Sequence, residues 1–185
     1  MRKYKLLNQE KFELEHYSLV PIREDDKFDI MNWRNEQIYH LRQNKLLTKE
    51  DQANYFEKVV SKLFEIDKPT QLLFSFLENE ICIGYGGLVH INWVDLHAEI
   101  SFVMNTKLEK EFFNKYWNIY LRILEDIAFN HIYLHKIYTY AFDLRPNVYE
   151  VLEDSGFYRE STLKDHCLFE GKYIDVIIHS KINKN

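Results

Sequence analysis

The chain has 185 residues, of which 46% are hydrophobic and 29% charged, and its net charge is −5. This balance is typical of one globular domain over residues 1–185 and excludes a disordered chain. The acidic charge disfavours a nucleic-acid partner. No apolar run approaches the roughly 20 residues that span a bilayer, so we expect no membrane partner either.

The cysteines indicate a reducing compartment. Cys82 and Cys167 lie far apart, no CxxC pair occurs, and no Cys/His cluster has zinc-ligand spacing. Residues 1–16 carry charges throughout and lack the apolar core of a signal peptide. We therefore expect a cytoplasmic protein with two buried thiols and no bound metal.

The N-terminal third predicts a strand followed by helices. Residues 17–23 alternate as a strand does, and Pro21 confines them to an edge or a strand end. Residues 24–36 begin with acidic side chains, which favour a helix N-terminus. Residues 48–51 (TKED) resemble a capping box, and apolar side chains at three- and four-residue spacing then predict a helix as far as Phe64.

The rest of the chain alternates strands with helices. The predicted strands are 72–77, 81–91, 96–104 and 136–142, and the predicted helices are 109–131 and 147–154. A turn at 78–80 joins the first two strands into a hairpin, Gly156 ends the second helix, and residues 167–182 predict a final hairpin. This order predicts an α+β fold, layered in the α/β manner, in which helices flank a mixed sheet.

Four ordered segments resemble the GNAT acyltransferases. They are residues 19–26, 98–104, 134–138, and 151–157 followed by 169–176. The resemblance covers nearly the whole chain and is nearest to the branch of ribosomal-protein N-terminal and polyamine acetyltransferases. It implies a mostly antiparallel central sheet. A fifth segment, at 33–36, 41–44 and 48–52, is similar to the acceptor region of GNAT enzymes that acetylate amino-sugar nucleotides.

The resemblance implies acetyl transfer from acetyl-CoA to a primary amine of a small molecule, with an amino-sugar nucleotide as the preferred acceptor and a polyamine or a protein N-terminus as alternatives. Glu99 then corresponds to the general base, which commonly acts through a water. Backbone groups of Phe102, Val103 and Met104 would bind the pantetheine arm and polarise the thioester. The pyrophosphate would lie at the next helix, with Lys110, Phe113, Asn114, Lys115 and Arg145 as its candidate contacts. The candidate acceptor-binding residues are Trp33, Arg34, Asn35, Arg42 and Gln43.

Two family features are absent. The glycines of the pyrophosphate loop fall on Phe113 and Lys115, and no glycine occurs between Gly87 and Gly156. The tyrosine that serves many GNAT enzymes as general acid is replaced by Leu152. These departures leave open an alternative, a GNAT-fold protein that acts as a non-catalytic module for binding a ligand or a partner. Homodimers are common in the family, so a homodimer is one expected assembly.

Some conspicuous residues have an ordinary structural interpretation. His90, His97 and His135 are each interpreted as lone histidines at a surface or strand edge, although His97 shares the face of Glu99. The cluster Gly84-Tyr85-Gly86-Gly87 lacks the strand–helix context of a nucleotide-binding motif. We expect it to mark a β-bulge or a close backbone crossing.

Overall fold

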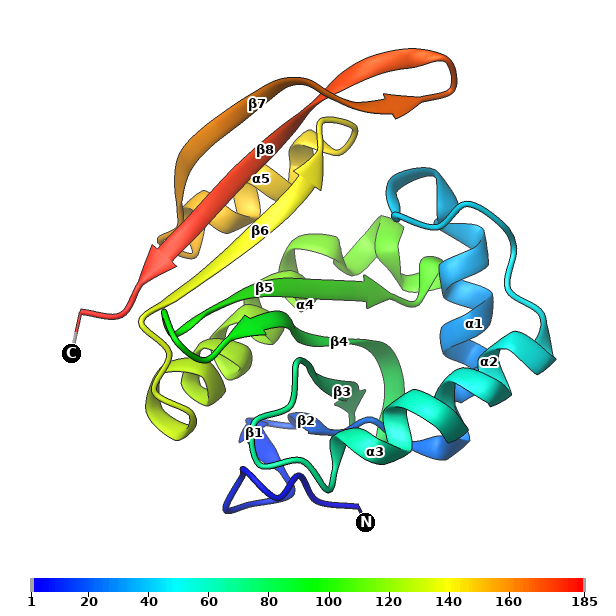
Figure 1. The fold of residues 1–185 in the computed structure, drawn as a ribbon, viewed down its shortest axis with the longest axis vertical. Coiled ribbons are helices and arrows are strands. Elements are labelled where there is room, and N and C mark those ends of the chain that lie inside the picture. Colours follow the sequence, from blue (N-terminus) through cyan, green and yellow to red (C-terminus); the bar gives the residue numbers. More distant parts are fainter. Residues whose placement is uncertain (1, 185) are drawn as a thin grey trace.

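The computed structural model describes residues 2–184 and contains one eight-stranded sheet (Figure 1). The strands are β1 (Phe12–Leu14), β2 (Tyr17–Pro21), β3 (Leu72–Glu78), β4 (Ile81–Asn92), β5 (His97–Met104), β6 (Lys136–Phe142), β7 (Tyr158–Phe169) and β8 (Lys172–Ile182). Their order is β1-β2-β3-β4-β5-β6-β8-β7. Only β5 and β6 pair in parallel, so the sheet is mostly antiparallel, as predicted.

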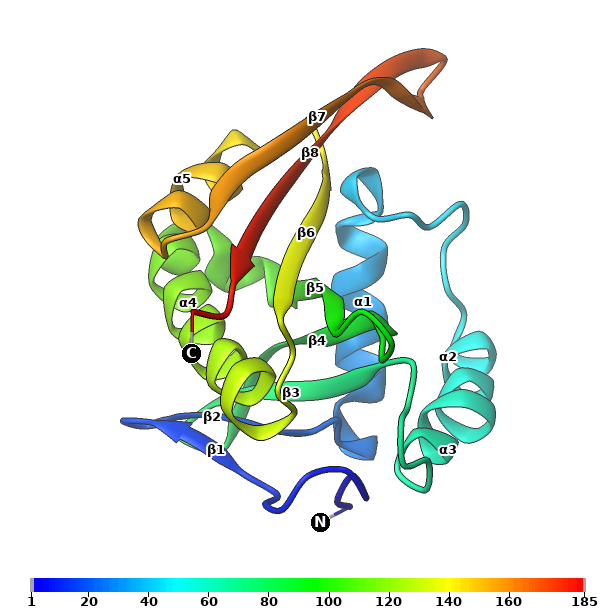
Figure 2. The same ribbon diagram turned by 60° about the vertical axis from the view of Figure 1, so that its left-hand side comes forward.

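Helices cover both faces of this sheet. They are η1 (Glu24–Asp26), α1 (Lys27–Glu36), η2 (Ile38–His40), α2 (Lys49–Tyr55), η3 (Phe56–Val60), α3 (Ser61–Leu63), α4 (Thr106–Asp126), η4 (Ile127–His131) and α5 (Pro146–Asp154). Figure 2 shows α4 and α5 on one side of the sheet and α1 to α3 on the other. The predicted α+β architecture is confirmed. None of these helices is both long and apolar enough to cross a membrane.

The predicted capping box forms as expected. The Asp51 backbone N–H donates to Thr48 Oγ1 at 3.1 Å, and the Thr48 backbone N–H donates to Asp51 Oδ2 at 3.0 Å. The helical stretch that follows runs through α2, η3 and α3 to Leu63. Its middle segment, η3, is a π-helix, which the apolar spacing did not predict.

Several element boundaries differ from the sequence predictions. The last hairpin begins at Tyr158 and not at residue 167. The sequence did not predict the first part of β7, because most of its side chains are exposed on both faces and apolar residues do not alternate along it. The predicted helix at 109–131 begins earlier, at Thr106. Strand β1 was not predicted, since its three residues are too few to show a pattern. Cys82 and Cys167 are free thiols but only partly buried, so the expectation of two buried thiols is wrong.

The glycine cluster lies in β4, where two neighbouring strands come very close. A Cβ at Gly86 would lie 2.0 Å from the Ser101 carbonyl oxygen, and one at Gly87 would lie 1.9 Å from the Leu72 carbonyl oxygen. The β3–β4 register also shifts between Phe76 and Leu77. The expected bulge and close backbone crossing are therefore both present, and they leave no room for side chains there.

Strand β5 separates from β6 after a short parallel contact. The two strands pair only at His97–Lys136, Ala98–Ile137 and Glu99–Tyr138. Beyond this point β6 stays paired with β8 along its whole length, while β5 continues beside β4 alone (Figure 1). Residues 100–104 therefore form a strand edge that opens toward a cleft.

Candidate active site

Alternate side chains of β5 face the two helical layers. Phe102 points toward α4, where its ring stacks on Tyr120 at 4.0 Å and meets Trp117 edge-on at 4.9 Å. Ser101 points the other way, since it lines a cavity beneath α1 together with Arg34 and Tyr85. Glu99 shares the face of Ser101 because strand side chains repeat every two residues. This strand thus presents a carboxylate and a hydroxyl to the α1 side.

A small cavity of about 130 Å³ fills the opening between β5 and β6; we call it the cleft cavity. Its lining includes Glu99, Ser101, Phe102, Tyr140 and Arg145. Of the three residues predicted to bind pantetheine, Phe102 lines the cleft cavity directly. The Met104 carbonyl accepts a hydrogen bond from buried Gln37 at 2.8 Å, so that end of the strand is already covered.

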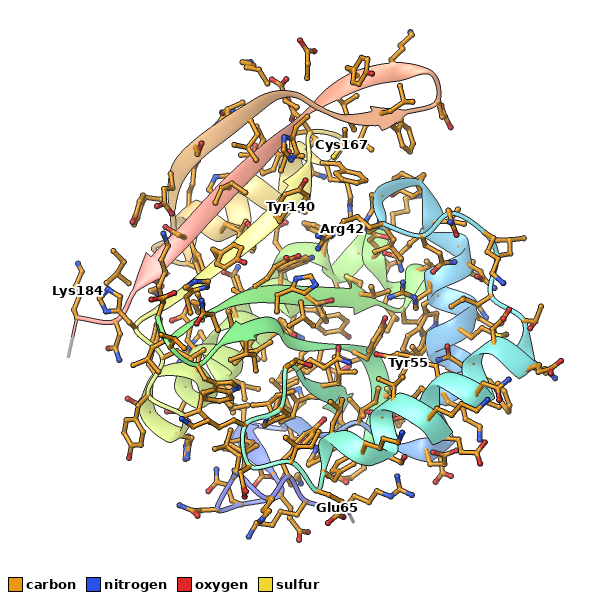
Figure 3. The ribbon with its side chains drawn as sticks, in the orientation of Figure 1. Arg42, Tyr55, Glu65, Tyr140, Cys167 and Lys184 are labelled. Carbon is orange, nitrogen blue, oxygen red and sulfur yellow. The ribbon has the colours of Figure 1, made fainter. Side chains whose placement is uncertain are left out.

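Glu99 is the buried carboxylate of the site. Its side chain is only 7% exposed, and its two oxygens contact different partners. Arg42 Nη2 donates to Oε1, and His90 Nδ1 lies 2.9 Å from Oε2. The Arg42 guanidinium also lies 4.7 Å from the ring centre of Tyr140, and these two side chains adjoin beneath the β7–β8 hairpin in Figure 3. Arg42 therefore holds Glu99 in place.

A larger cavity of about 400 Å³ lies between α1, α2 and the sheet; we call it the α1 cavity. Apolar side chains form most of its wall, and the polar and charged ones include Arg34, Asp51, Gln52, Tyr55, Gln71 and Tyr85. Arg34 Nη1 donates to the Tyr85 hydroxyl at 2.6 Å, and its Nε donates to Gln43 at 3.0 Å. Within residues 2–184 no carboxylate forms an ion pair with Arg34.

The predicted acceptor residues separate into different roles. Only Arg34 lines the α1 cavity. Trp33 is buried in the hydrophobic core. Asn35 holds the loop before α2, since it donates to the Leu47 carbonyl at 2.9 Å and accepts from the Leu47 N–H at 2.8 Å. Gln43 orients Arg34 and also donates to Asn35 at 3.1 Å.

Sequence reasoning missed most of the polar wall of the α1 cavity. Gln52 lies in the segment that resembles the acceptor region but was not singled out as a candidate, and Tyr55 was counted only among the apolar side chains of the predicted helix. Gln71 gave no indication, because isolated polar residues beside apolar ones are common at strand ends. Tyr85 did give one: it lies inside the glycine cluster, in a strand pressed closely between its neighbours. Glycines inside a strand mark a place where a ligand or another backbone comes close, so the cluster indicated this part of β4.

A third cavity, of about 800 Å³, lies beside the first turns of α4; we call it the α4 cavity. All five predicted pyrophosphate contacts line it, namely Lys110, Phe113, Asn114, Lys115 and Arg145. Arg145 is bound to the carboxylate of Glu109, and it also donates to His40 Nε2 at 2.9 Å. Burial and the Arg145 charge lower the pKa of His40 to about 3, so His40 is neutral and can accept this bond.

The start of α4 takes a different form from the family's loop. The helix begins at Thr106, two residues after β5 ends, and Asn105 caps it by accepting from the Lys107 N–H at 3.1 Å. Phe113 and Lys115, which stand at the family's glycine positions, are therefore inside a continuous helix. A ligand phosphate at this place would meet side chains of α4 and α5 and not a loop of backbone N–H groups.

The three cavities adjoin one another. Arg145 lines both the α4 cavity and the cleft cavity, and Ser101 lines both the cleft cavity and the α1 cavity. The cavities therefore lie in a row, from the charged start of α4, past the open edge of β5, to the space beneath α1. Glu99 lies at the junction of the last two spaces.

The last helix, α5, supplies no hydroxyl to this junction. Leu152 is fully buried. The Tyr149 hydroxyl donates to Asp143 Oδ1 at 3.0 Å, and its ring stacks on His179 at 5.3 Å, so it is held away from the cleft cavity. The hydroxyls that line the cleft cavity come from Ser101, Thr139 and Tyr140. Thr139 Oγ1 is buried and has no hydrogen-bond partner among the described residues.

The comparisons with known proteins identify this architecture. A family model described as an acetyltransferase (GNAT) domain matches residues 19–178. The chain belongs to the GNAT acetyltransferase family. It is a GNAT-type N-acetyltransferase. No curated protein matches the chain by sequence.

Solved structures of GNAT proteins share the fold. Spermidine N-acetyltransferase from Vibrio cholerae in complex with CoA and spermine has a TM-score of 0.77 and 20% identity, over 91% of this chain and 96% of that one. A dodecameric structure of the same enzyme has a TM-score of 0.72 and 21% identity, over 91% and 95%. A chimera of that enzyme, SpeG, has a TM-score of 0.74 and 22% identity, over 90% and 95%.

The residues present fit acetyl-CoA in part. The open edge of β5 and the cations of the α4 cavity suit a thioester arm and its phosphates, whereas the glycine loop is absent. No group of three or more His, Cys, Asp or Glu side chains within residues 2–184 is arranged to hold a metal ion.

Proposed function

We propose that this protein transfers the acetyl group of acetyl-CoA to the primary amine of a small molecule, and that residues 1–185 act as one domain. The observation that carries the proposal is the junction at Ser101 and Glu99. There a cleft beside an unpaired strand edge adjoins a cavity large enough for a small acceptor. An amine in the α1 cavity and a thioester in the cleft cavity would lie within reach of each other.

On the donor side, backbone groups of Phe102, Val103 and Met104 are proposed to bind the pantetheine arm and polarise the thioester carbonyl. Lys110, Lys115 and Arg145 are proposed to bind the phosphates, with Phe113 and Asn114 beside them. Glu109 must release Arg145 for this to happen, because the two are paired in the protein alone.

At the junction, the amine nitrogen forms a bond to the acetyl carbon, and the carbon–sulfur bond breaks with its electron pair going to sulfur. The carboxylate of Glu99 drives removal of the proton that the nitrogen loses. The released thiolate takes a proton from solvent, since no α5 tyrosine faces the cleft cavity.

On the acceptor side, we propose an amine that also carries an acidic group, of which an amino-sugar nucleotide is the first candidate. Support comes from Arg34, a partly buried cation that forms no ion pair with a carboxylate among the described residues, in the wall of the α1 cavity. Asp51 also lines this cavity and is paired with Lys45. A charge placed in apolar surroundings is costly unless an opposite charge meets it. A phosphate or carboxylate of the acceptor would supply that charge, whereas a polyamine would supply none.

The test joins a binding measurement to an activity measurement. Acetyl-CoA or CoA at 100 times its dissociation constant should stabilise the protein by about 2.7 kcal/mol, which is several degrees in Tm. Mass spectrometry should then detect acetylation of an amino-sugar nucleotide in preference to spermidine or a peptide N-terminus. An unchanged Tm would refute the donor assignment. Preferential acetylation of spermidine would refute the acceptor assignment.

Two further properties are proposed with the function. The enzyme is proposed to act in the cytoplasm, where its two free cysteines stay reduced. It is proposed to form a homodimer and to bind neither nucleic acid nor membrane. Sedimentation velocity at micromolar concentration measures the oligomeric state directly.

A further inference from the structure

His90 has an unusual backbone conformation within β4. Its φ angle is +50°, in the left-handed region that residues other than Gly adopt uncommonly, with Asn, Asp and His the most frequent among them. The pairing of β4 with β5 is regular up to Val89, which lies opposite Glu99, and then shifts before Asn92. In a regular strand His90 would point to the face opposite Val89. The local irregularity instead brings its ring to Glu99, on the same face as Val89.

The contact between the two side chains has a definite orientation. Nδ1 of His90 lies 2.9 Å from Glu99 Oε2, while no protein group in residues 2–184 bonds to its Nε2. The His90 side chain is 63% exposed and that of Glu99 is 7% exposed. Glu99 lines the cleft cavity, and Val89, the residue before His90, lines the α1 cavity. His90 itself lines neither cavity, so its ring reaches the site from the solvent side of Glu99.

We propose that His90 and Glu99 form a proton-accepting dyad, in which Nε2 of His90 takes the proton of the acceptor amine and Glu99 orients and stabilises the imidazole. This inference rests on the proposed acetyl transfer and specifies its base. A carboxylate that accepts from Nδ1–H holds the other ring nitrogen as a free lone pair, which is the state a general base needs.

The proton balance of the step is simple. As the nitrogen bonds to the acetyl carbon, its proton moves to His90 Nε2, directly or through one water. The ring becomes an imidazolium, and the carboxylate of Glu99, at hydrogen-bond distance, offsets its charge. Nε2 then loses the same proton to solvent, which its exposed ring already contacts. The dyad returns to its starting state without a change of tautomer.

Other charged and titratable groups around the dyad have separate contacts. Arg42 binds the second oxygen of Glu99 and leaves Oε2 to His90. Tyr138 and Tyr140 face Glu99 from β6, and burial is the main cause that raises the pKa of each hydroxyl, so both keep their protons at neutral pH. The His97 ring lies 5.8 Å from that of Tyr138 and does not bond to Glu99. His90 is thus the exposed base of this group.

The sharpest variant is His90→Asn. Asparagine tolerates the left-handed backbone, and its amide can donate to Glu99 as Nδ1 does, but it cannot accept a proton. We expect kcat to fall at least about tenfold with a smaller change in the acceptor KM, and added imidazole to restore part of the rate. The rise of rate with pH that an imidazole base produces should disappear. His135→Asn, which removes an exposed histidine elsewhere, should behave as wild type.

The outcomes separate this inference from the proposed function. Wild-type activity in His90→Asn, with loss of activity in Glu99→Gln, would mean that Glu99 alone is the base. A slow His90→Asn with no imidazole rescue and an unchanged pH profile would reduce His90 to a positioning residue. Ring nitrogen NMR needs no turnover: the Nδ1–H tautomer of His90 should predominate in wild type and decline in Glu99→Gln. An identical tautomer ratio in both proteins would refute the dyad even if no acceptor were known.

Discussion

The α1 cavity and the α4 cavity differ in whether their arginine is paired with a protein carboxylate. Beneath α1, Arg34 bonds only to neutral groups, the Tyr85 hydroxyl and the Gln43 amide. Beside α4, Arg145 is paired with Glu109, and Lys115 lies 3.9 Å from Glu78. Arg34 is therefore ready for an anion, whereas Arg145 and Lys115 must first leave their carboxylate partners. Lys110, which also lines the α4 cavity, forms no ion pair among the described residues. We infer that the acceptor side is preorganised and that donor binding includes the cost of breaking these pairs.

The largest expected effect lies at the junction, outside both cavities. Glu99→Gln keeps the size of the side chain and removes its negative charge, so the amine proton loses the charge that draws it away. We expect kcat to fall about 100-fold, with little change in the affinity for either substrate. Steady-state kinetics with both substrates varied measures this, and unchanged Tm shows that the fold is intact. A loss of binding without a loss of kcat would contradict the role of Glu99.

Arg34→Met tests whether the α1 cavity is the preorganised side. Losing a charge-assisted contact should raise the KM of an acidic acceptor by about ten- to a hundredfold. The affinity for acetyl-CoA should stay within about twofold, because the two sites share no cation. Arg122→Met, an exposed change on α4, is the matched control. Equal loss of acceptor and CoA binding would break the distinction between the two cavities.

The pair Arg145 and Glu109 tests whether the α4 cavity is held closed by its own charges. Arg145→Gln should weaken CoA binding by about tenfold, since one phosphate contact is lost. Glu109→Gln should do the reverse and tighten CoA binding by up to about fivefold, since it frees Arg145 and removes a repulsive charge. Isothermal titration with CoA measures both. Weaker binding in Glu109→Gln would show that the ion pair shapes the site rather than blocks it.

How far the sequence could predict these regions depends on the range of the interactions involved. The β5 strand and the face of Glu99 follow from two-residue alternation, a local property that tertiary packing did not alter. The start of α4 did not follow, because the family's loop and a helix compete over the same residues. Asn105 favours the helix, because its side chain caps α4 directly after β5.

The partners of Glu99 were beyond sequence reasoning for a different reason. Arg42 is 57 residues away and reaches Glu99 from a loop with no regular pattern. His90 reaches it only because of a left-handed residue in a strand, which alternation would have placed on the other face. The resemblance to the family could supply the carboxylate, but the side chains around it depend on backbone irregularities that no periodicity encodes.

The smallest expected effect concerns Lys115, whose side chain is 51% exposed. Its ammonium group already lies near the Glu78 carboxylate and over the rings of Tyr17 and Tyr116. Because solvent screens such a charge, Lys115→Glu should weaken CoA binding by only about two- to fivefold, and raising the salt concentration should erase the difference. Lys62→Glu, the same change on the exposed face of α3, controls for net charge. A loss as large as that of Arg145→Gln would instead make Lys115 a direct phosphate ligand, and the α4 cavity would then hold one cation nearly as ready for an anion as Arg34.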